Sequence, residues 1–485
     1  MHRILAGLET EYGLDVEGRG AEDQVDDAEA LVRSYPGECL AVWDDRFESP
    51  RADLRGFTLD RLSVDPEDAR FDAGRAREPI ERARADRVLP NGARFYNDHG
   101  HPEYATPECL GDLELALHDR AGELAVLRAA QAFSNAVGRR ARVYKNNTDF
   151  HGASYGAHES YLVPRPLGFE RLFAALTPML VARTVLCGAG KVGSEHGGAC
   201  DFQMSQRADF LTEAASADTL FRRPVFNTRD EPHADPKRWI RVHVISGDAN
   251  MTVRGTARKV GLAKLALGLA IDDAAPSWRL RDPAQAMRAV SRDVSGNGRI
   301  ELEGGGSTTA GAVILSYIEA AERAWGSQGG ECRAEWGALL ADLSEGPVRF
   351  AAQVDWAAKG AMIGEFLDTE GVGWDDPRAR AFDLEYHNID PEEGLCRALE
   401  AMGRLPEPPS GKEVAERLER VCEPTRARAR GAAVRNLGAA VQTMCWRSIT
   451  FEQGSVDLDP AREVPREIEG AYDVESFMRM IRGER

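Results

Sequence analysis

The stretch NGARFYNDHGHPEYATPEC, residues 91–109, gathers titratable and metal-binding side chains into a segment with little apolar content. If this segment is a strand, successive side chains point to opposite faces. Arg94, Tyr96 and Asp98 then share one face, and Phe95 points to the other. The spacing therefore predicts a strand with one polar face and one apolar face, as in a half-buried sheet.

Beyond Asp98 the chain bends through Gly100 and Pro102 and presents Glu103. An arginine beside carboxylates suits a phosphate-bearing ligand, because the guanidinium group binds phosphate oxygens while carboxylates hold Mg²⁺ against them. A surface patch of ion pairs with a hydrogen-bonded tyrosine is the simpler alternative.

A second stretch, GLETEYG at residues 7–13, has the same alternation. Glu9 and Glu11 point to one side of a strand, with Leu8 and Thr10 on the other. Taken alone, it is equally typical of two solvated glutamates on an exposed sheet. The two stretches together favour a site for Mg²⁺ and a nucleotide.

Further segments supply polar side chains of the same kinds. RWIRVHVISGDAN (238–250) places Arg241 and His243 on one face of a strand, and YKNNTDFHGASYGAHESY (144–161) carries His158. A single strand histidine is more often structural than a ligand. SQRADF (205–210) and NTRDEPHAD (227–235) add two arginines, for which local ion pairing is an equally good explanation: Arg207 and Arg229.

The order of the elements predicts an α+β fold. A helical pattern at 113–133 precedes strand-like runs at 142–147 and 238–247, without a regular βαβ rhythm, which favours an antiparallel sheet. Residues 255 to about 400 are mostly helical in pattern. The Pro-rich segment at 404–413 predicts a boundary between a large domain and a small one. The predicted ranges are 1–405 and 406–485, with a mobile loop over about 48–87 that is rich in charge, Pro and Gly.

Composition excludes several classes of protein. The net charge of −18 argues against general nucleic-acid binding, and an apolar fraction of 43% with 29% charged residues is typical of a globular protein. The N-terminal segment lacks the apolar core of a signal peptide, and the most apolar stretches are too short to span a membrane. Eight cysteines occur singly, without CxxC. We therefore expect a cytoplasmic protein with reduced thiols.

Two local motifs carry no function. GAGKVG (188–193) matches GxGxxG, but SEHGGACDF follows it instead of a helical pattern, so a dinucleotide-binding fold is not predicted. The same residues do not meet the GxxxxGK[ST] pattern of a phosphate-binding P-loop. HExxH is absent from the sequence, so a zinc protease has no support.

Taken together, the segments resemble, in order, the Pup ligase and depupylase family, whose members are related to glutamine synthetase and the carboxylate–amine ligases. The resemblance rests on GLETEYG, NGARFYNDHGHPEYATPEC, YKNNTDFHGASYGAHESY, CGAGKV, SQRADF, NTRDEPHAD and VHVISGDANM, and extends to CWRSITFE near the C-terminus. It implies a large glutamine synthetase-like domain, in which helices pack on a curved antiparallel sheet that cradles ATP and Mg²⁺, and a small C-terminal domain.

The resemblance also implies roles for individual residues. Asp98 matches the catalytic aspartate. The positions that match Mg²⁺ ligands are Glu9, Tyr96 and Glu103, and we add Glu11, His158 and His243 from matching segments. The positions that match ATP contacts are Arg94, Thr106 and Trp446, and we add Arg207 and Arg229.

Two activities are implied for one site. A ligase phosphorylates the C-terminal glutamate side chain of the small protein Pup, and a lysine of a target protein then forms an isopeptide bond. A depupylase hydrolyses that bond and deamidates the C-terminal glutamine of Pup. Either activity implies Pup and pupylated proteins as partners, with a functional link to the bacterial proteasome. In both, a carboxylate must lie near the carbonyl, as general base or nucleophile.

The spacing from Asp98 to His101 resembles the depupylase pattern, since ligases have one more residue before the H-P-E-Y motif. The segment ESPRADLRGF (48–57) also resembles the depupylase, whereas GLETEYG is closer to the ligase opening. We predict a depupylase, with a Pup ligase as the alternative. A small-molecule carboxylate–amine ligase and a non-enzymatic nucleotide-binding relative are further alternatives.

Overall fold

The structure is a computed structural model, and it describes most of the chain. The described ranges are 2–46, 48, 51–60, 85–149, 152–195, 198–219, 222–345 and 350–484.

A six-stranded sheet forms the centre of the molecule, and each of its neighbouring pairs is antiparallel. Its order is β12 (Trp239–Val244), β7 (Ala157–Pro164), β1 (Ala6–Glu11), β5 (His101–Ala105), β4 (Arg94–Asp98) and β3 (Asp86–Val88). The predicted α+β class with an antiparallel sheet is confirmed.

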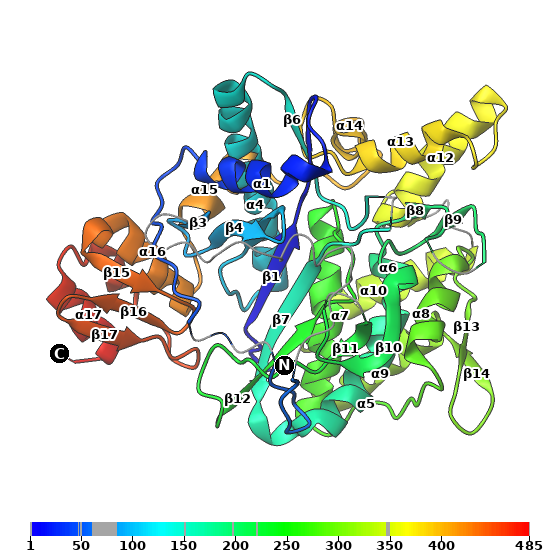
Figure 1. The fold of residues 1–485 in the computed structure, drawn as a ribbon. Coiled ribbons are helices and arrows are strands. Elements are labelled where there is room, and N and C mark those ends of the chain that lie inside the picture. Colours follow the sequence, from blue (N-terminus) through cyan, green and yellow to red (C-terminus); the bar gives the residue numbers. More distant parts are fainter. Residues whose placement is uncertain are drawn as a thin grey trace.

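Helices cover one face of this sheet (Figure 1). Helix α4 (Asp112–Val137) packs against β1 and β5, and α7 (Val253–Ile271) packs against β7. Gly122 of α4 allows this close packing, because a Cβ atom there would lie 2.3 Å from the ring of Tyr104 on β5. The other face of the sheet is therefore left for polar side chains.

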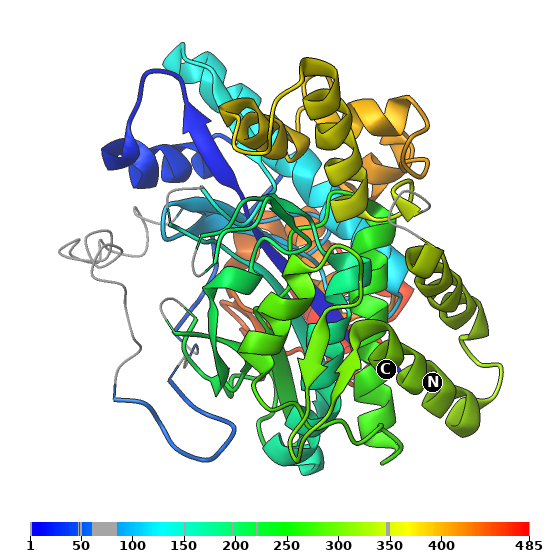
Figure 2. The ribbon, with the colours of Figure 1, turned by 90° about the vertical axis from the view of Figure 1, so that its right-hand side faces the viewer.

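The remaining helices and strands surround this core. Figure 2 places the helices of residues 310–401 on the side of the molecule opposite the C-terminal unit, which lies behind them. In chain order the helices are α1 (Gln24–Arg33), α5 (Gly168–Ala182), α6 (Thr184–Cys187), α8 (Pro283–Arg292), α9 (Ala310–Trp325), α10 (Gly330–Glu345), α12 (Asp355–Glu370), α13 (Pro377–Tyr386), α14 (Leu395–Ala401), α15 (Gly411–Glu419), α16 (Arg426–Leu437) and α17 (Val474–Arg482).

Small sheets complete the secondary structure. The pairs are β2 (Gly13–Val16) with β6 (Ala141–Tyr144), β8 (Lys191–Val192) with β9 (Phe202–Gln203), β10 (Leu211–Ser216) with β11 (Arg223–Asn227), and β13 (Arg299–Glu301) with β14 (Ser307–Thr309). The C-terminal unit holds β15 (Val441–Met444), β16 (Ser448–Phe451) and β17 (Gly454–Asp457). Short 3₁₀ helices occur at Ala21–Asp23, Arg165–Leu167, Ala208–Phe210, Gly438–Ala440 and Arg466–Gly470.

Most of the predicted elements are confirmed. Helix α4 contains the predicted 113–133 segment, and β12 lies within 238–247. The strand predicted at 142–147 was too long, because β6 ends at Tyr144. Beyond it the side chain of Asn146 donates to the carbonyl of Thr148, and such local bonds compete with a strand ladder.

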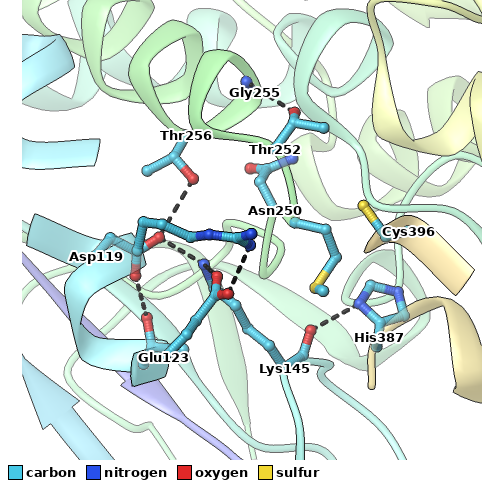
Figure 3. Close-up of polar contacts among 12 residues, drawn as sticks. Asp119, Glu123, Lys145, Asn250, Thr252, Gly255, Thr256, His387 and Cys396 are labelled. Carbon is cyan, nitrogen blue, oxygen red and sulfur yellow. Dashed lines mark hydrogen bonds and ion pairs between the residues drawn. The ribbon is translucent and has the colours of Figure 1, made fainter. Parts of the chain in front are cut away.

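Strand β1 has a buried polar network behind it, on the helical side of the sheet (Figure 3). Asp119 of α4 accepts hydrogen bonds from Thr10 of β1 at 3.1 Å, from Lys145 at 2.6 Å and from Thr256 of α7 at 3.3 Å. Lys145 also donates to Glu123 at 3.0 Å. One carboxylate thus ties the strand to both covering helices.

The C-terminal unit has an apolar cluster of its own, which includes α16, the strands β15, β16 and β17, and α17. Trp43 and Val88 join this cluster from the N-terminal part of the chain. Val414 and Leu418 of α15 pack instead with the apolar residues around α4. The division at residue 405 stays a prediction.

The predicted mobile loop at 48–87 lies largely outside the described residues. The described segment 51–60 contacts Thr228. Leu54 donates its N–H to the carbonyl of Thr228 at 2.7 Å. The buried Asp53 accepts hydrogen bonds from Arg55 and from the hydroxyl of Thr228.

Across the described ranges, no helix is both long enough and apolar enough to cross a membrane. GAGKVG contains β8, and no helix begins in the described residues that directly follow it, which agrees with its exclusion as a dinucleotide motif.

Glu108 joins the sheet to the C-terminal unit. It accepts hydrogen bonds from Arg426 at 2.5 Å and from Arg430 at 3.1 Å, both on α16, and all three residues are buried. Burial alone would raise the pKa of Glu108, but the charges of Arg430 and Arg426 outweigh burial and lower it to about 2.

We expect Glu108→Gln to destabilise the protein by about 3–5 kcal/mol, because it leaves two buried guanidinium groups without their anion. Urea unfolding at pH 7, followed by the fluorescence of Trp446 and the other tryptophans, measures the loss. The effect should shrink as the pH falls from about 4.5 toward 2, since the unfolded chain then binds a proton at Glu108 that the folded protein binds only near pH 2.

Glu463→Gln is the matched control. Glu463 pairs with Arg3, but their side chains are 63% and 64% exposed, so the unfolding midpoint should not move. Equal midpoints for Glu108→Gln and wild type would show that the buried pairing contributes nothing.

Candidate functional site

The open face of the sheet presents its polar side chains in rows. Residues that pair across antiparallel strands point to the same face, so the register sets the rows. Three rows cross the strands, and they consist of Asp98 with His101, of Tyr96 with Glu103 and Glu11, and of Arg94 with Ala105, Glu9 and His158. The predicted alternation in both signature stretches is confirmed.

Carboxylates from three strands meet in a first cluster of Glu11, Asp98 and Glu103, whose nearest oxygen atoms all lie within 4.8 Å of one another. Tyr96 donates its hydroxyl to Glu103 at 2.6 Å. Burial and the neighbouring charges of Asp98, Glu11 and Glu9 raise the pKa of Glu103 well above its ordinary value. The cluster repels itself, and a cation would relieve that repulsion.

Asp98 lies at the rim of this cluster. Its side chain is 40% exposed, whereas Glu103 is buried. Burial would raise the pKa of Asp98, but the contact with His99 outweighs burial and lowers it. His101, the cross-strand partner of Asp98, stacks on Tyr155 with ring centroids 4.5 Å apart. Asp98 is therefore an accessible, ionised carboxylate.

A second cluster combines Glu9 with His158 and His243, again with ligand atoms within 4.8 Å. Burial lowers the pKa of His243 well below its ordinary value, so its ring is neutral. Burial opposes ionisation of Glu9, but the two imidazoles and Arg241 lower its pKa well below the ordinary value. An anionic carboxylate between two imidazoles is a chemically suitable ligand set for a cation.

Gly156 makes the approach of these groups possible. A Cβ atom at this position would lie 2.4 Å from the ring of His158 and 2.5 Å from the carboxylate of Glu11. Any larger residue would push one of the two clusters out of place.

Two arginines, Arg241 and Arg229, lie near Glu9. Arg241 is buried, lies 3.5 Å from Glu9 and is held by Glu231 through a hydrogen bond of 2.8 Å to its carbonyl oxygen. Burial and the charge of Arg241 lower the pKa of Arg229. The sequence prediction included Arg229 but gave no role to Arg241, although its strand face had been assigned correctly.

A cleft opens beside Glu9, between the sheet and the C-terminal unit. Its lining includes Thr106, Arg241, His233, Arg426 and Trp446. Trp446 packs edge to face against Trp43, with ring centroids 4.7 Å apart. The cleft combines apolar residues with two arginines, which suits a base and phosphates.

Arg94 lies in the same cross-strand row as Glu9, on strand β4. Its guanidinium group covers the rings of Tyr96 and Trp43 at 3.7 and 4.8 Å and donates to Asp86 at 2.6 Å. Trp43 and His233 were missed by the sequence analysis. Trp43 reaches the site only through a tertiary contact, whereas His233 stood within a quoted segment without a role.

Arg207 is placed differently from the other predicted residues. It is buried and donates to the carbonyl oxygens of Tyr155 and Ile245, the latter at 2.9 Å. Burial lowers its pKa to about 10. These contacts hold the backbone around Tyr155, and a contact of Arg207 with a ligand stays a prediction.

The ligand atoms that each cluster offers determine which metal ions it suits. Oxygen ligands from carboxylates and a tyrosine suit a hard cation such as Mg²⁺, so the first cluster fits that ion. Imidazole is also accepted by transition-metal ions, so the second cluster is less selective. Both lie on the same face as the arginines, which is the arrangement needed to hold cations against phosphates.

Comparison with known proteins gives a consistent result. The family described as Pup-ligase protein matches residues 3–450. A depupylase of Acidothermus cellulolyticus is 35% identical over 469 residues, which are 93% of this chain and 91% of the relative. A Pup deamidase/depupylase of Mycobacterium tuberculosis is 34% identical over 476 residues, with 94% and 92% coverage. A Pup–protein ligase of Mycobacterium ulcerans is 37% identical over 366 residues, with 73% and 80% coverage.

Two solved structures share the fold. The Pup ligase PafA in complex with Pup superimposes with a TM-score of 0.78 at 28% identity, covering 98% of this chain and 92% of the other. PafA in complex with ADP superimposes with a TM-score of 0.72 at 30% identity, with 88% and 96% coverage. The glutamine synthetase-like expectation agrees with this likeness.

We expect Glu103→Gln to weaken the binding of Mg²⁺ at least about 10-fold, because it removes a charged ligand from the first cluster. Without metal, the variant should be as stable as wild type or more stable, since it also removes buried repulsion. Melting curves with and without Mg²⁺, and titration calorimetry, measure both effects.

Glu301→Gln is the control, because Glu301 is a 57% exposed strand carboxylate far along the chain from the clusters. It should keep the wild-type response to Mg²⁺. A full Mg²⁺ response in Glu103→Gln would refute the proposed ligand.

Proposed function

The chain belongs to the Pup-ligase family, and from this premise we propose that it is a depupylase. It hydrolyses the isopeptide bond between the C-terminal glutamate side chain of Pup and a lysine of a target protein, and it deamidates a C-terminal glutamine of Pup. We place this activity in the cytoplasm, with pupylated proteins as substrates and a functional link to the proteasome.

The observation that carries this choice is the extent of the similarity. Relatives named depupylase match 93–94% of the chain, whereas the Pup–protein ligase matches 73% of it. The short connection between Asp98 and His101 supports the same choice, because it has the depupylase spacing.

We propose that the two clusters hold Mg²⁺ and that the cleft binds ATP. When bound, the ion would neutralise the carboxylates and stabilise negative charge on neighbouring oxygens. The residues for Mg²⁺ are Glu9, Glu11, Tyr96, Glu103, His158 and His243, and those for the nucleotide are Arg94, Thr106, Arg207, Arg229 and Trp446. ADP in a PafA structure supports a nucleotide here.

Hydrolysis breaks the C–N bond, forms a new C–O bond from water and delivers a proton to the departing lysine amine. Asp98 fits this reaction because it is ionised and half exposed beside buried groups. It acts either as the base that takes a proton from water or as the nucleophile that attacks the carbonyl.

Ligation is the second candidate, because the solved structures with this fold are of a Pup ligase. In that direction Asp98 would deprotonate the lysine before it attacks a γ-glutamyl phosphate. A small-molecule ligase would consume ATP with an amino acid and would not act on Pup.

A gel assay decides between these functions. Purified protein with Mg²⁺ and ATP should release Pup from a Pup-conjugated protein and should not join free Pup ending in glutamate to a lysine-bearing target. Conjugation in the second reaction would establish the ligase, and inactivity in both would favour a small-molecule reaction. Asp98→Asn should reduce the release about 10²-fold or more, while nucleotide binding persists.

Asp15→Asn is the matched control, because Asp15 is a 57% exposed strand aspartate on β2. It should retain wild-type turnover. Full activity of Asp98→Asn would remove Asp98 from the reaction.

We also expect Trp446→Ala to weaken ATP binding about 10-fold, because it removes an aromatic wall of the cleft. Fluorescence titration with a labelled nucleotide measures the loss. Tyr472→Ala, at a 75% exposed aromatic residue of the same C-terminal unit, should leave affinity unchanged. Equal affinities in all three proteins would place the nucleotide elsewhere.

A further inference from the structure

The turn between β4 and β5 holds an unusual residue beside Asp98. Asp98 and His101 pair across the strands, so His99 and Gly100 alone form the connection. Both have positive φ, at 47° for His99 and 89° for Gly100. Positive φ at both central residues defines a type I′ turn, in which Asn-Gly is the preferred pair.

A histidine at this position is unfavourable for the backbone. Residues with a Cβ atom rarely adopt the left-handed region. Histidine is found there more often than most of them, but asparagine and glycine adopt it more easily. Packing does not account for the choice, because the His99 side chain is 45% exposed. A strained residue beside a candidate reacting group is a reason to look for a role of the side chain.

The ring of His99 contacts Asp98 directly. Its Nδ1 atom lies 3.0 Å from Oδ1 of Asp98. Gln24 of α1 donates to the carbonyl of Gly100 at 3.0 Å, and a Cβ atom at Gly100 would lie 3.3 Å from a methyl group of Val25. The turn is thus anchored from outside, so the ring is presented to Asp98 from a fixed backbone.

We infer that His99 is a positioning residue that holds the carboxylate of Asp98 in place, for its role as base or nucleophile, at the rim of the carboxylate cluster. A bond to one oxygen restricts rotation of the carboxylate and selects the oxygen that faces the substrate. The left-handed backbone is what places the ring there. This inference rests on the proposed function of Asp98.

The test separates the effect of the His99 backbone conformation from the effect of its ring. His99→Gly relieves the left-handed backbone and removes the ring, so we expect the melting temperature to be maintained or raised while kcat for Pup release falls about 10- to 100-fold. The KM for the Pup conjugate and the affinity for ATP should stay unchanged. A role confined to the turn cannot lower kcat while stability is maintained.

His99→Asn is the rescue variant, because asparagine tolerates positive φ and carries an amide donor. It should restore kcat to within about threefold of wild type. Asp273→Gly is the matched control, since Asp273 has a φ of 58° and is 86% exposed at the end of α7. It should relieve the same strain and keep the wild-type kcat.

The possible outcomes distinguish the positioning role of His99 from the proposed function of Asp98. Wild-type kcat in His99→Gly with an inactive Asp98→Asn would overturn the positioning role and leave the proposed function standing. Full activity of Asp98→Asn would overturn the proposed function itself. A lowered melting temperature with equal losses of kcat in His99→Gly and His99→Asn would reduce His99 to a turn residue and overturn the inference.

Discussion

The site depends on the alternation of side chains along β1. This strand lies between β7 and β5 inside the sheet, so hydrogen bonds on both edges fix its register. Glu9 and Glu11 then point to the open face, while Thr10 points to Asp119 behind the sheet. A shift of one residue would bury both glutamates among the helices and expose the apolar face. The fold and the two clusters of candidate ligands are therefore set by the same register.

The network around Asp119 matters because it holds charges in the core. Lys145 is buried with Asp119 and Glu123, and removing any one partner would leave an unpaired charge in an apolar region. Such networks add little net stability, but they select one arrangement of the strand and its helices. On the opposite face of the sheet, like charges surround Glu103, and their repulsion is unfavourable. The buried network around Asp119 holds the strands in place despite that repulsion.

The sequence predicted the face of each strand residue, because a period of two needs only local information. Glu9, Glu11, Arg94, Tyr96, Asp98, Arg241 and His243 were assigned in this way. It did not predict that Glu9 joins His158 and His243 while Glu11 joins Glu103, since that division follows from the pairing of strands distant in the chain. Trp43 was missed for the same reason, because it reaches Trp446 only when the N-terminal part meets the C-terminal unit. The contacts of Arg207 could not be predicted from its segment, because its partners are backbone carbonyls of distant residues.

The candidate ligand residues and the residues at the edge of the site lie on different kinds of structure. The candidate ligand residues lie on paired strands supported by buried contacts, so they are held with little freedom. The groups at the edge come from connections, with His99 in a two-residue turn and Trp446 on the C-terminal unit. Changing the length of that turn by one residue would rotate Asp98 relative to His101 without disturbing β1. One sheet can carry different reactions when its connections differ, and the difference predicted between depupylases and Pup ligases, one residue in this turn, lies at the rim of the sheet.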